Sequence, residues 1–133
     1  MQYLVIKCGG SVFEELPDDF YRQVVHLQQS GQWQPIIVHG GGPSISAMLK
    51  QLNVPSTFVN GLRVTTPEVL DAVEMVLSGK INKMVVSKLK QAGGAAIGLS
   101  GVDADLLEVV PVPNHREIGL VGEGTRVNAT LLR

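Results

Sequence analysis

Two glycine-rich turns hold the residues of this sequence that are best suited to chemistry. The first is Lys7-Cys8-Gly9-Gly10-Ser11, and the second is His39-Gly40-Gly41-Gly42-Pro43-Ser44. Glycine has no Cβ, so backbone N–H groups in such turns can approach an anion closely. The second turn also leads into a predicted helix, whose N-terminus favours negative charge. Side by side, the two turns could hold a phosphate and the group that accepts it.

Each glycine turn also has a simpler interpretation, as a tight connection between a strand and a helix. Neither turn matches the Walker A sequence or the dinucleotide-binding fingerprint, which argues against an ordinary P-loop or Rossmann cofactor site. The occurrence of both turns in one short sequence favours an anion-binding site over the purely structural interpretation.

Two cationic side chains accompany these turns. Lys7 stands at the end of the first predicted strand, where it could neutralise a transferred phosphoryl group or remain a solvated surface charge. Arg63 follows the Asn60-Gly61 pair, where it could hold a carboxylate through two parallel hydrogen bonds or be an ordinary surface arginine. The residue types alone leave both alternatives open.

Four other residues that could do chemistry are predicted to be structural. His39 has no second His, Cys or carboxylate at metal-ligand spacing, so no metal site is predicted. Asp103 and Asp105 lie in a polar turn, where carboxylates commonly cap backbone N–H groups. Cys8 is predicted to be a small core residue, and a single cysteine excludes an intrachain disulfide.

Alternating strands and helices position the two turns. Apolar runs at residues 3–6 and 35–38 predict buried strands, and a helix is predicted after each, beginning at Pro17 and at Pro43. This βαβα order implies a parallel sheet with right-handed crossovers. The carboxyl ends of both strands, and therefore both turns, should lie at the same edge of that sheet.

The remainder of the sequence predicts a hairpin, two helices and further strands. Asn60-Gly61 between apolar residues indicates a hairpin over residues 58–64 that projects as a flap. Thr66-Pro67 predicts the start of a helix over residues 67–78, which Gly79 separates from a second helix. Strands are predicted at 95–99, 106–112 and 118–121, the last two flanking a hairpin turn at 113–117, and Asn128 is predicted to cap a final helix.

Composition bounds the fold class and excludes several functions. The 133 residues suffice for one domain with a sizeable core. With 44% hydrophobic but only 5% aromatic residues, the sequence favours an α/β fold with helices on both faces of a sheet. A net charge of -1 without blocks of like charge gives no indication of nucleic-acid binding. The sequence has neither a signal-peptide pattern nor the roughly 20 apolar residues that span a bilayer, so we expect a cytoplasmic protein without membrane contact.

At its two glycine turns and at the predicted hairpin, the sequence resembles the amino-acid kinase family. Lys7-Cys8-Gly9-Gly10-Ser11 is similar to the opening phosphate loop of the family, and residues 38–43 are similar to its second glycine loop. Asn60-Gly61-Leu62-Arg63-Val64-Thr65 is the more specific segment, because it is similar to the substrate-flap motif of the N-acetylglutamate kinases. The resemblance covers essentially the whole sequence. It implies a three-layer α/β/α sandwich with a mainly parallel central sheet and added β-hairpins.

The resemblance also implies a reaction and a role for each candidate residue. The reaction would be the ATP-dependent phosphorylation of the side-chain carboxylate of N-acetyl-L-glutamate in arginine biosynthesis, with Mg²⁺ carried by the nucleotide. Lys7 would stabilise charge on the transferred group, and the N–H groups of Gly9 and Gly10 would hold the γ-phosphate. The N–H groups of Gly41 and Gly42 would orient the attacking carboxylate. Arg63 would pair with the α-carboxylate of the substrate.

The resemblance further implies that residues 1–133 are the N-terminal, amino-acid-substrate-binding part of a longer kinase domain, without its C-terminal nucleotide-binding half. It implies a homodimer formed through the helix at residues 67–78. Two alternatives stay open. One is another amino-acid or carbamate kinase of the same fold, and the other is a non-catalytic amino-acid-binding module.

Overall fold

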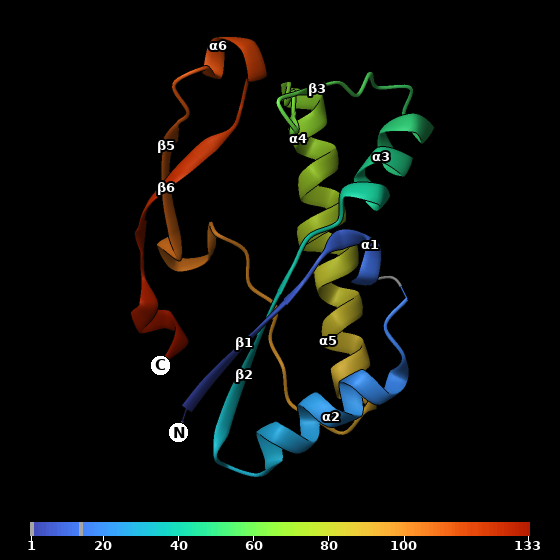
Figure 1. The fold of residues 1–133 in the computed structure, drawn as a ribbon, viewed down its shortest axis with the longest axis vertical. Helices are drawn as coiled ribbons and strands as arrows, with labels where there is room; N and C mark the ends of the chain where they lie inside the picture. Colours follow the sequence, from blue (N-terminus) through green and yellow to red (C-terminus); the bar gives the residue numbers. More distant parts are fainter. Residues whose placement is uncertain (1, 14) are drawn as a thin grey trace.

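The computed structural model describes residues 2–13 and 15–133, and it places one parallel strand pair beside a group of helices (Figure 1). β1 (Gln2–Cys8) and β2 (Trp33–His39) run parallel and in register, with Lys7 opposite Val38. The connection between them contains α1 (Gly10–Phe13) and α2 (Asp18–Gln29), and α3 (Gly42–Gln51) follows β2. The predicted α/β class and the parallel βαβα unit are therefore confirmed.

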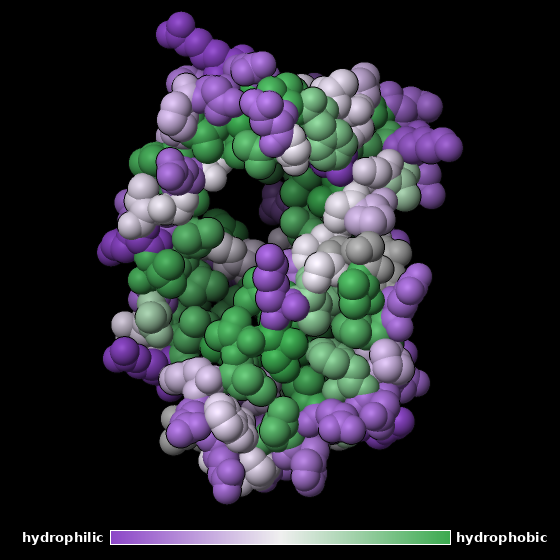
Figure 2. All heavy atoms as spheres, viewed as in Figure 1, coloured by the Kyte–Doolittle hydropathy of each residue, from purple (hydrophilic) through white to green (hydrophobic). Residues whose placement is uncertain are grey.

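The helices pack with one face of β1 and β2 around a common core. Along β1, Ile6 and Cys8 face this core, whereas Tyr3 and Val5 on the opposite face are 49% and 62% exposed. Alternate residues of a strand point to opposite faces, so this pattern means that one face is covered. In the described residues, helices therefore cover one of the two faces of the strand pair, as one side of the predicted three-layer arrangement requires. Apolar surface gathers over β1 and β2 in Figure 2. Helical residues complete the core: Phe13, Tyr21, Ile45, Leu49, Val69, Ala72, Val76, Ile81 and Val85.

The predicted flap is present as a short hairpin. β3 (Phe58–Val59) and β4 (Leu62–Arg63) are antiparallel, and Asn60 and Gly61 form the two-residue turn between them. Both turn residues have positive φ, 50° for Asn60 and 80° for Gly61. A two-residue turn of this type requires that conformation, and an Asn-Gly pair adopts it readily. The hairpin prediction is confirmed.

A single helical run occupies the stretch in which two helices are predicted. α4 (Pro67–Glu74), a π-helix (Met75–Ile81) and α5 (Asn82–Gln91) follow one another without a break. The start is as predicted, since the Thr66 hydroxyl accepts a hydrogen bond of 3.3 Å from the N–H of Val69. The predicted interruption at Gly79 is wrong. Val76 and Ile81 are at most 2% exposed, and such packing outweighs the cost of about 1 kcal/mol for a glycine within a helix.

The strand predicted at residues 95–99 is wrong. The backbone groups of this segment form hydrogen bonds with side chains instead of with a neighbouring strand. Gln28 binds both the N–H and the carbonyl of Ala95, at 3.3 and 2.7 Å. The amide of Asn82 donates to the Leu99 carbonyl at 3.2 Å. Side chains from α2 and α5 therefore supply hydrogen bonds that a neighbouring strand would otherwise make.

The C-terminal part contains one antiparallel hairpin, but with a different second strand from the predicted one. β5 (Leu107–Pro111) lies within the predicted strand at 106–112, and it pairs with β6 (Gly122–Val127). Residues 113–117 lie in the connection between the two strands, as predicted, but they include most of the short helix α6 (His115–Ile118). The strand predicted at 118–121 is wrong, because the second strand begins only at Gly122. Ile118 is fully buried, and the Thr65 backbone binds the Ile118 carbonyl and the Leu120 N–H, both at 2.8 Å. The apolar run therefore packs beside Thr65.

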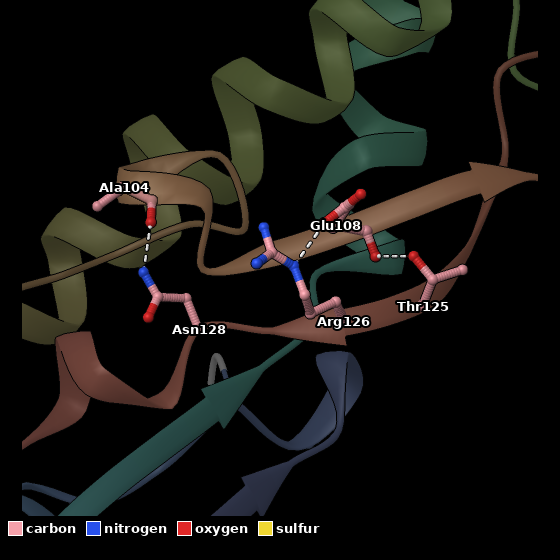
Figure 3. Close-up of polar contacts among 5 residues, drawn as sticks. All are labelled: Ala104, Glu108, Thr125, Arg126 and Asn128. Atoms are coloured by element: carbon pink, nitrogen blue, oxygen red, sulfur yellow. Dashed lines mark hydrogen bonds and ion pairs between the residues drawn. The ribbon is translucent and has the colours of Figure 1, made fainter.

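Polar contacts fasten the base of this hairpin (Figure 3). Arg126 Nε donates to the Glu108 carboxylate at 2.6 Å, and the Thr125 hydroxyl donates to the Glu108 carbonyl at 3.1 Å. The Asn128 amide donates to the carbonyl of Ala104, within the short 3₁₀ helix Asp103–Asp105, at 2.9 Å. Asn128 stands at the N-cap position of a final 3₁₀ helix (Ala129–Leu132), but its side chain makes no capping hydrogen bond, so the position is as predicted and the side-chain cap is not.

Candidate functional site

The two glycine turns lie side by side at one end of the β1–β2 pair. Cys8 is paired with His39, so the turns that follow these residues begin at the same level of the sheet. The N–H of Gly40 donates to the Cys8 carbonyl at 3.4 Å, and the Phe13 ring lies 5.5 Å from the His39 ring. Both turns therefore form one unit at the carboxyl edge of the strands, where ligands bind in open α/β sheets.

The first glycine turn is open to solvent. Lys7 is exposed at the end of β1, and Gly9 is exposed just after it. A Cβ on Gly9 would meet no atom within 4 Å, and Gly10 begins α1. The Gly9 carbonyl accepts hydrogen bonds of 3.1 Å from the N–H groups of Val12 and Phe13, which holds the turn in shape. This turn can therefore receive an anion from solvent.

The second glycine turn is packed against the π-helix. Gly41 is the N-cap of α3, and a Cβ there would lie 2.8 Å from Cδ2 of Leu77 and closer still to Cδ1 of Ile81. Gly42 is exposed, and its Cβ position is free of atoms within 4 Å. The N–H groups of a first helical turn have no acceptor within the helix. Long π-helices are rare, and here the π-helix supports the turn that presents such donors.

Gly41→Ala is expected to lower the free energy of unfolding by about 1–3 kcal/mol, because the added methyl group would overlap the buried Ile81 side chain. Gly42→Ala is the matched control and should cost less, since its methyl group would enter open space. Urea unfolding followed by circular dichroism measures both. Ile81→Val should recover part of the stability that Gly41→Ala loses. Equal stabilities for Gly41→Ala and Gly42→Ala would show that the packing against the π-helix is unimportant.

Arg63, on β4, contacts the start of α3 and the flap. Its Nη2 donates to the Gly42 carbonyl at 3.3 Å and to the Ser46 hydroxyl at 3.0 Å, and its Nη1 donates to the Ser56 hydroxyl. The guanidinium carbon lies 4.6 Å from the centre of the Phe58 ring. Burial lowers the pKa of Arg63, but an arginine side chain stays protonated in proteins. Among the described residues, a positive charge held by neutral groups therefore stands beside the second glycine turn.

A pocket of about 350 Å³ opens beside Arg63. This volume falls in the lower part of the range of roughly 300–1,000 Å³ that is usual for small-molecule sites. Among the described residues that line the pocket, Arg63 alone is charged. Such a pocket suits an anion that also carries an apolar group. The other lining residues come from α3, β4, the link from β4 to α4, α4, the segment after α6 and the start of β6: Ile45, Leu62, Thr65, Leu70, Val73, Leu120, Val121 and Gly122.

A larger hollow of about 720 Å³ lies at the base of the β5–β6 hairpin. Its lining residues are Gly101, Val102, Asp105, Leu107, Glu108, Val109 and Arg126. Size alone would favour it as the site. However, its arginine is already paired with Glu108 at 2.6 Å. The smaller pocket contains Arg63, which forms no ion pair with an acidic side chain among the described residues and donates a hydrogen bond to the Gly42 carbonyl of the second glycine turn, so we assign the candidate site there.

Cys8 and Asp103 have the structural places predicted for them. Cys8 is 7% exposed within the core, and burial raises its pKa. The Asp103 carboxylate accepts hydrogen bonds from the N–H of Ser100 at 2.6 Å and from its hydroxyl at 2.9 Å, which lowers the pKa of Asp103. The ring of His39 lies 3.2 Å from the Gly40 carbonyl.

The described part of the chain comprises residues 2–13 and 15–133. Within this described part of the chain, no group of three or more His, Cys, Asp and Glu side chains could hold a metal ion. Nor does any helix there combine the length and apolar character that a membrane-spanning helix needs.

The structure brings Arg63 into contact with the Gly41–Gly42 turn. Because Lys7 on β1 is opposite Val38 on β2, Lys7 lies at the same end of the strand pair as this turn. Sequence reasoning missed the residues that hold Arg63. Phe58 could have been found, because a two-residue turn at Asn60-Gly61 places residue 58 opposite residue 63. Ser46 and Ser56 carry no such signal, since their approach depends on how α3 and the flap pack.

Comparison with known proteins identifies the family. A model of the amino acid kinase family matches residues 2–133. The chain belongs to the amino acid kinase family. It is 55% identical over 130 residues to the acetylglutamate kinase of Geobacillus thermodenitrificans (strain NG80-2), a match that covers 98% of this chain and 50% of that protein. It is 53% identical over 129 residues to the acetylglutamate kinase of Halalkalibacterium halodurans, covering 97% of this chain and 49% of that protein. This amino acid kinase chain therefore spans about half the length of the relatives it matches.

Solved structures confirm the amino acid kinase fold. The crystal structure of smu.665 from Streptococcus mutans UA159 superposes with a TM-score of 0.88 at 32% identity, over 98% of this chain and 52% of that one. N-acetylglutamate synthase from Neisseria gonorrhoeae, in complex with coenzyme A and L-arginine, gives a TM-score of 0.63 at 16% identity over 99% of this chain and 32% of that one. The second likeness concerns the fold alone.

Proposed function

We propose that this chain is the N-terminal, amino-acid-substrate-binding part of an acetylglutamate kinase. The complete enzyme would transfer the γ-phosphoryl group of ATP to the side-chain carboxylate of N-acetyl-L-glutamate, giving N-acetyl-L-glutamyl 5-phosphate and ADP for arginine biosynthesis. The observation that carries the proposal is the pocket beside Arg63, in which an arginine that forms no ion pair among the described residues, and that donates to the Gly42 carbonyl, meets apolar walls. The relatives named acetylglutamate kinase support the same substrate.

The chemistry of the pocket fits the three parts of this substrate. N-acetyl-L-glutamate carries an α-carboxylate, an acetyl group and a side-chain carboxylate. Arg63 would pair with the α-carboxylate, as a guanidinium is well suited to a planar anion. The apolar walls, to which Leu62 and Leu120 belong, would receive the acetyl methyl group. The side-chain carboxylate would then extend toward the N–H groups of Gly41 and Gly42.

The proposed reaction needs positioning and charge stabilisation more than acid–base chemistry. One oxygen of the side-chain carboxylate attacks the γ-phosphorus, and the bond from that phosphorus to the bridging oxygen of ADP breaks. The attacking group is already an anion, so no general base is required. Lys7 would stabilise the charge on the transferred group, and the N–H groups of Gly9 and Gly10 would hold the γ-phosphate. Alignment of donor and acceptor would supply much of the acceleration.

The nucleotide would enter with Mg²⁺ bound to its phosphates. The glycine turns offer N–H donors, which fit phosphate oxygens, whereas Mg²⁺ prefers oxygen ligands. The adenine would be bound by a C-terminal half that residues 1–133 do not contain. We further propose a cytoplasmic homodimer that associates through the helix at residues 67–78, on which Met75 is 55% exposed.

A substrate comparison on the complete enzyme tests the proposal. ADP release is measured with ATP and, in turn, N-acetyl-L-glutamate, L-glutamate, L-aspartate and carbamate. We expect the highest kcat/KM for N-acetyl-L-glutamate, because the acetyl group adds apolar contact and removes the ammonium charge from the pocket. A higher kcat/KM for carbamate or for an unacylated amino acid would favour another kinase of the same fold. Binding of N-acetyl-L-glutamate without any ADP release would favour a non-catalytic module.

A further inference from the structure

We infer that Ser46, Ser56 and Phe58 are positioning residues that hold the guanidinium of Arg63 in place before the substrate binds. The inference rests on the proposed function, because it takes the α-carboxylate of an acylated amino acid as the group that Arg63 receives. The three residues would act through Arg63 and would not touch the reacting atoms.

The contacts that restrain Arg63 come from three separate segments. Ser46 lies in the first half of α3 and binds Nη2 at 3.0 Å. Ser56 precedes β3 and binds Nη1. Phe58 stands opposite Arg63 in the hairpin register, and its ring lies 4.6 Å from the guanidinium carbon. With both Nη atoms bonded and one face of the plane covered, the guanidinium has a defined position and orientation.

All of these partners are uncharged, so the positive charge of Arg63 remains available for a substrate carboxylate. A carboxylate partner within the protein would compete with a substrate carboxylate for the same donors. Arg22 and Arg126 have such partners, since they pair with Asp19 and Glu108 at 3.3 and 2.6 Å. Among the described residues, no acidic side chain forms an ion pair with Arg63. Hydroxyl oxygens and an aromatic face therefore restrain this arginine without neutralising it.

The same contacts tie Arg63 to the second glycine turn. Nη2 also donates to the Gly42 carbonyl at 3.3 Å, and Ser46 lies four residues further along α3. The point that would hold the α-carboxylate and the turn that would orient the attacking carboxylate are thus parts of one connected group. An arginine fixed in advance does not lose its freedom of rotation when the substrate binds, so pre-organisation favours affinity.

Kinetics of the complete enzyme test the inference. Ser46→Ala combined with Ser56→Ala is expected to raise KM for N-acetyl-L-glutamate by about tenfold while kcat stays within about twofold, because binding is weakened far from the transferred group. Ser46→Thr combined with Ser56→Thr keeps both hydroxyls and should bring KM back to within about threefold of wild type. Ser87→Ala, at an exposed position on α5, is the matched control and should leave both constants unchanged.

A measurement without turnover separates this inference from the proposed function. In ¹⁵N NMR spectra of the complete enzyme, assigned with Arg63→Lys, we expect restricted rotation of the Arg63 Nη groups in wild type and faster rotation in the double alanine variant. Fast rotation in wild type would overturn the inference. Wild-type KM in the double alanine variant of an enzyme that phosphorylates N-acetyl-L-glutamate would also overturn it, leaving the proposed function intact. Restricted rotation in an enzyme that does not phosphorylate N-acetyl-L-glutamate would support the positioning role and contradict the proposed function.

Discussion

Replacing Lys7 by alanine is expected to lower kcat of the complete enzyme by about 10²-fold or more, with a much smaller change in KM for N-acetyl-L-glutamate. The ammonium group of Lys7 would stabilise negative charge that develops on the transferred phosphoryl group, and removing such a group costs transition-state stabilisation. Lys7 is exposed at the end of β1, beside the open first glycine turn, so the substitution leaves the core untouched. Initial rates of ADP release at saturating substrate measure the effect.

Lys50→Ala is the matched control for this experiment. Lys50 is exposed near the end of α3, and its loss removes the same charge from a site away from the first glycine turn. The control should keep wild-type kcat. If Lys7→Ala turned over as fast as Lys50→Ala, Lys7 would be a solvated surface charge, which is the alternative that the sequence leaves open.

Arg63→Ala is expected to raise KM for N-acetyl-L-glutamate by about 10²-fold, while kcat changes far less. The α-carboxylate that Arg63 would hold is remote from the transferred group, and removing one member of a charged, hydrogen-bonded pair weakens binding by several kcal/mol. Arg63→Lys keeps the charge but not the planar fork, and it should give an intermediate KM. The measurement is the dependence of ADP release on substrate concentration. An unchanged KM in Arg63→Ala would exclude the assigned role.

Those parts of the fold that are determined by residues close together in the sequence could be predicted from the sequence. The Asn60-Gly61 turn has the positive φ angles that its residue types allow, and Thr66 caps the helix that begins at Pro67. The parallel pairing of β1 and β2 follows from the βαβ order, because a connection through a helix returns the chain in the same direction. That pairing was also enough to place the two glycine turns together.

Other parts could not be predicted, because distant residues decide them. Residues 95–99 have the composition of a strand, yet Gln28 and Asn82 supply the hydrogen bonds to their backbone. Gly79 is a residue type that often interrupts helices, yet the burial of Val76 and Ile81 on either side keeps the helix intact. In each case tertiary contacts outweigh a local preference.

The candidate site shows the same division. Lys7, Arg63 and the glycine turns were predicted from residue type and resemblance, and the structure brings Arg63 to the second turn. The apolar walls of the pocket were not predicted, because Leu120 belongs to a segment that the sequence assigned to a strand of the β5 hairpin. That segment reaches the pocket through the backbone hydrogen bonds of Thr65.

The central claim is that the pocket beside Arg63 holds the α-carboxylate of N-acetyl-L-glutamate, and a comparison of two substrates tests it most directly. The second substrate is N-acetyl-L-glutamic acid α-amide, which keeps the side-chain carboxylate but has a neutral amide in place of the α-carboxylate. ADP release is measured with each substrate, for the wild-type enzyme and for Arg63→Ala. We predict that wild type prefers N-acetyl-L-glutamate by about 10²-fold in kcat/KM and that Arg63→Ala treats the two substrates almost alike. If Arg63→Ala kept the wild-type preference, or if wild type did not distinguish the two substrates, the α-carboxylate would be bound elsewhere and the account of this site would be wrong.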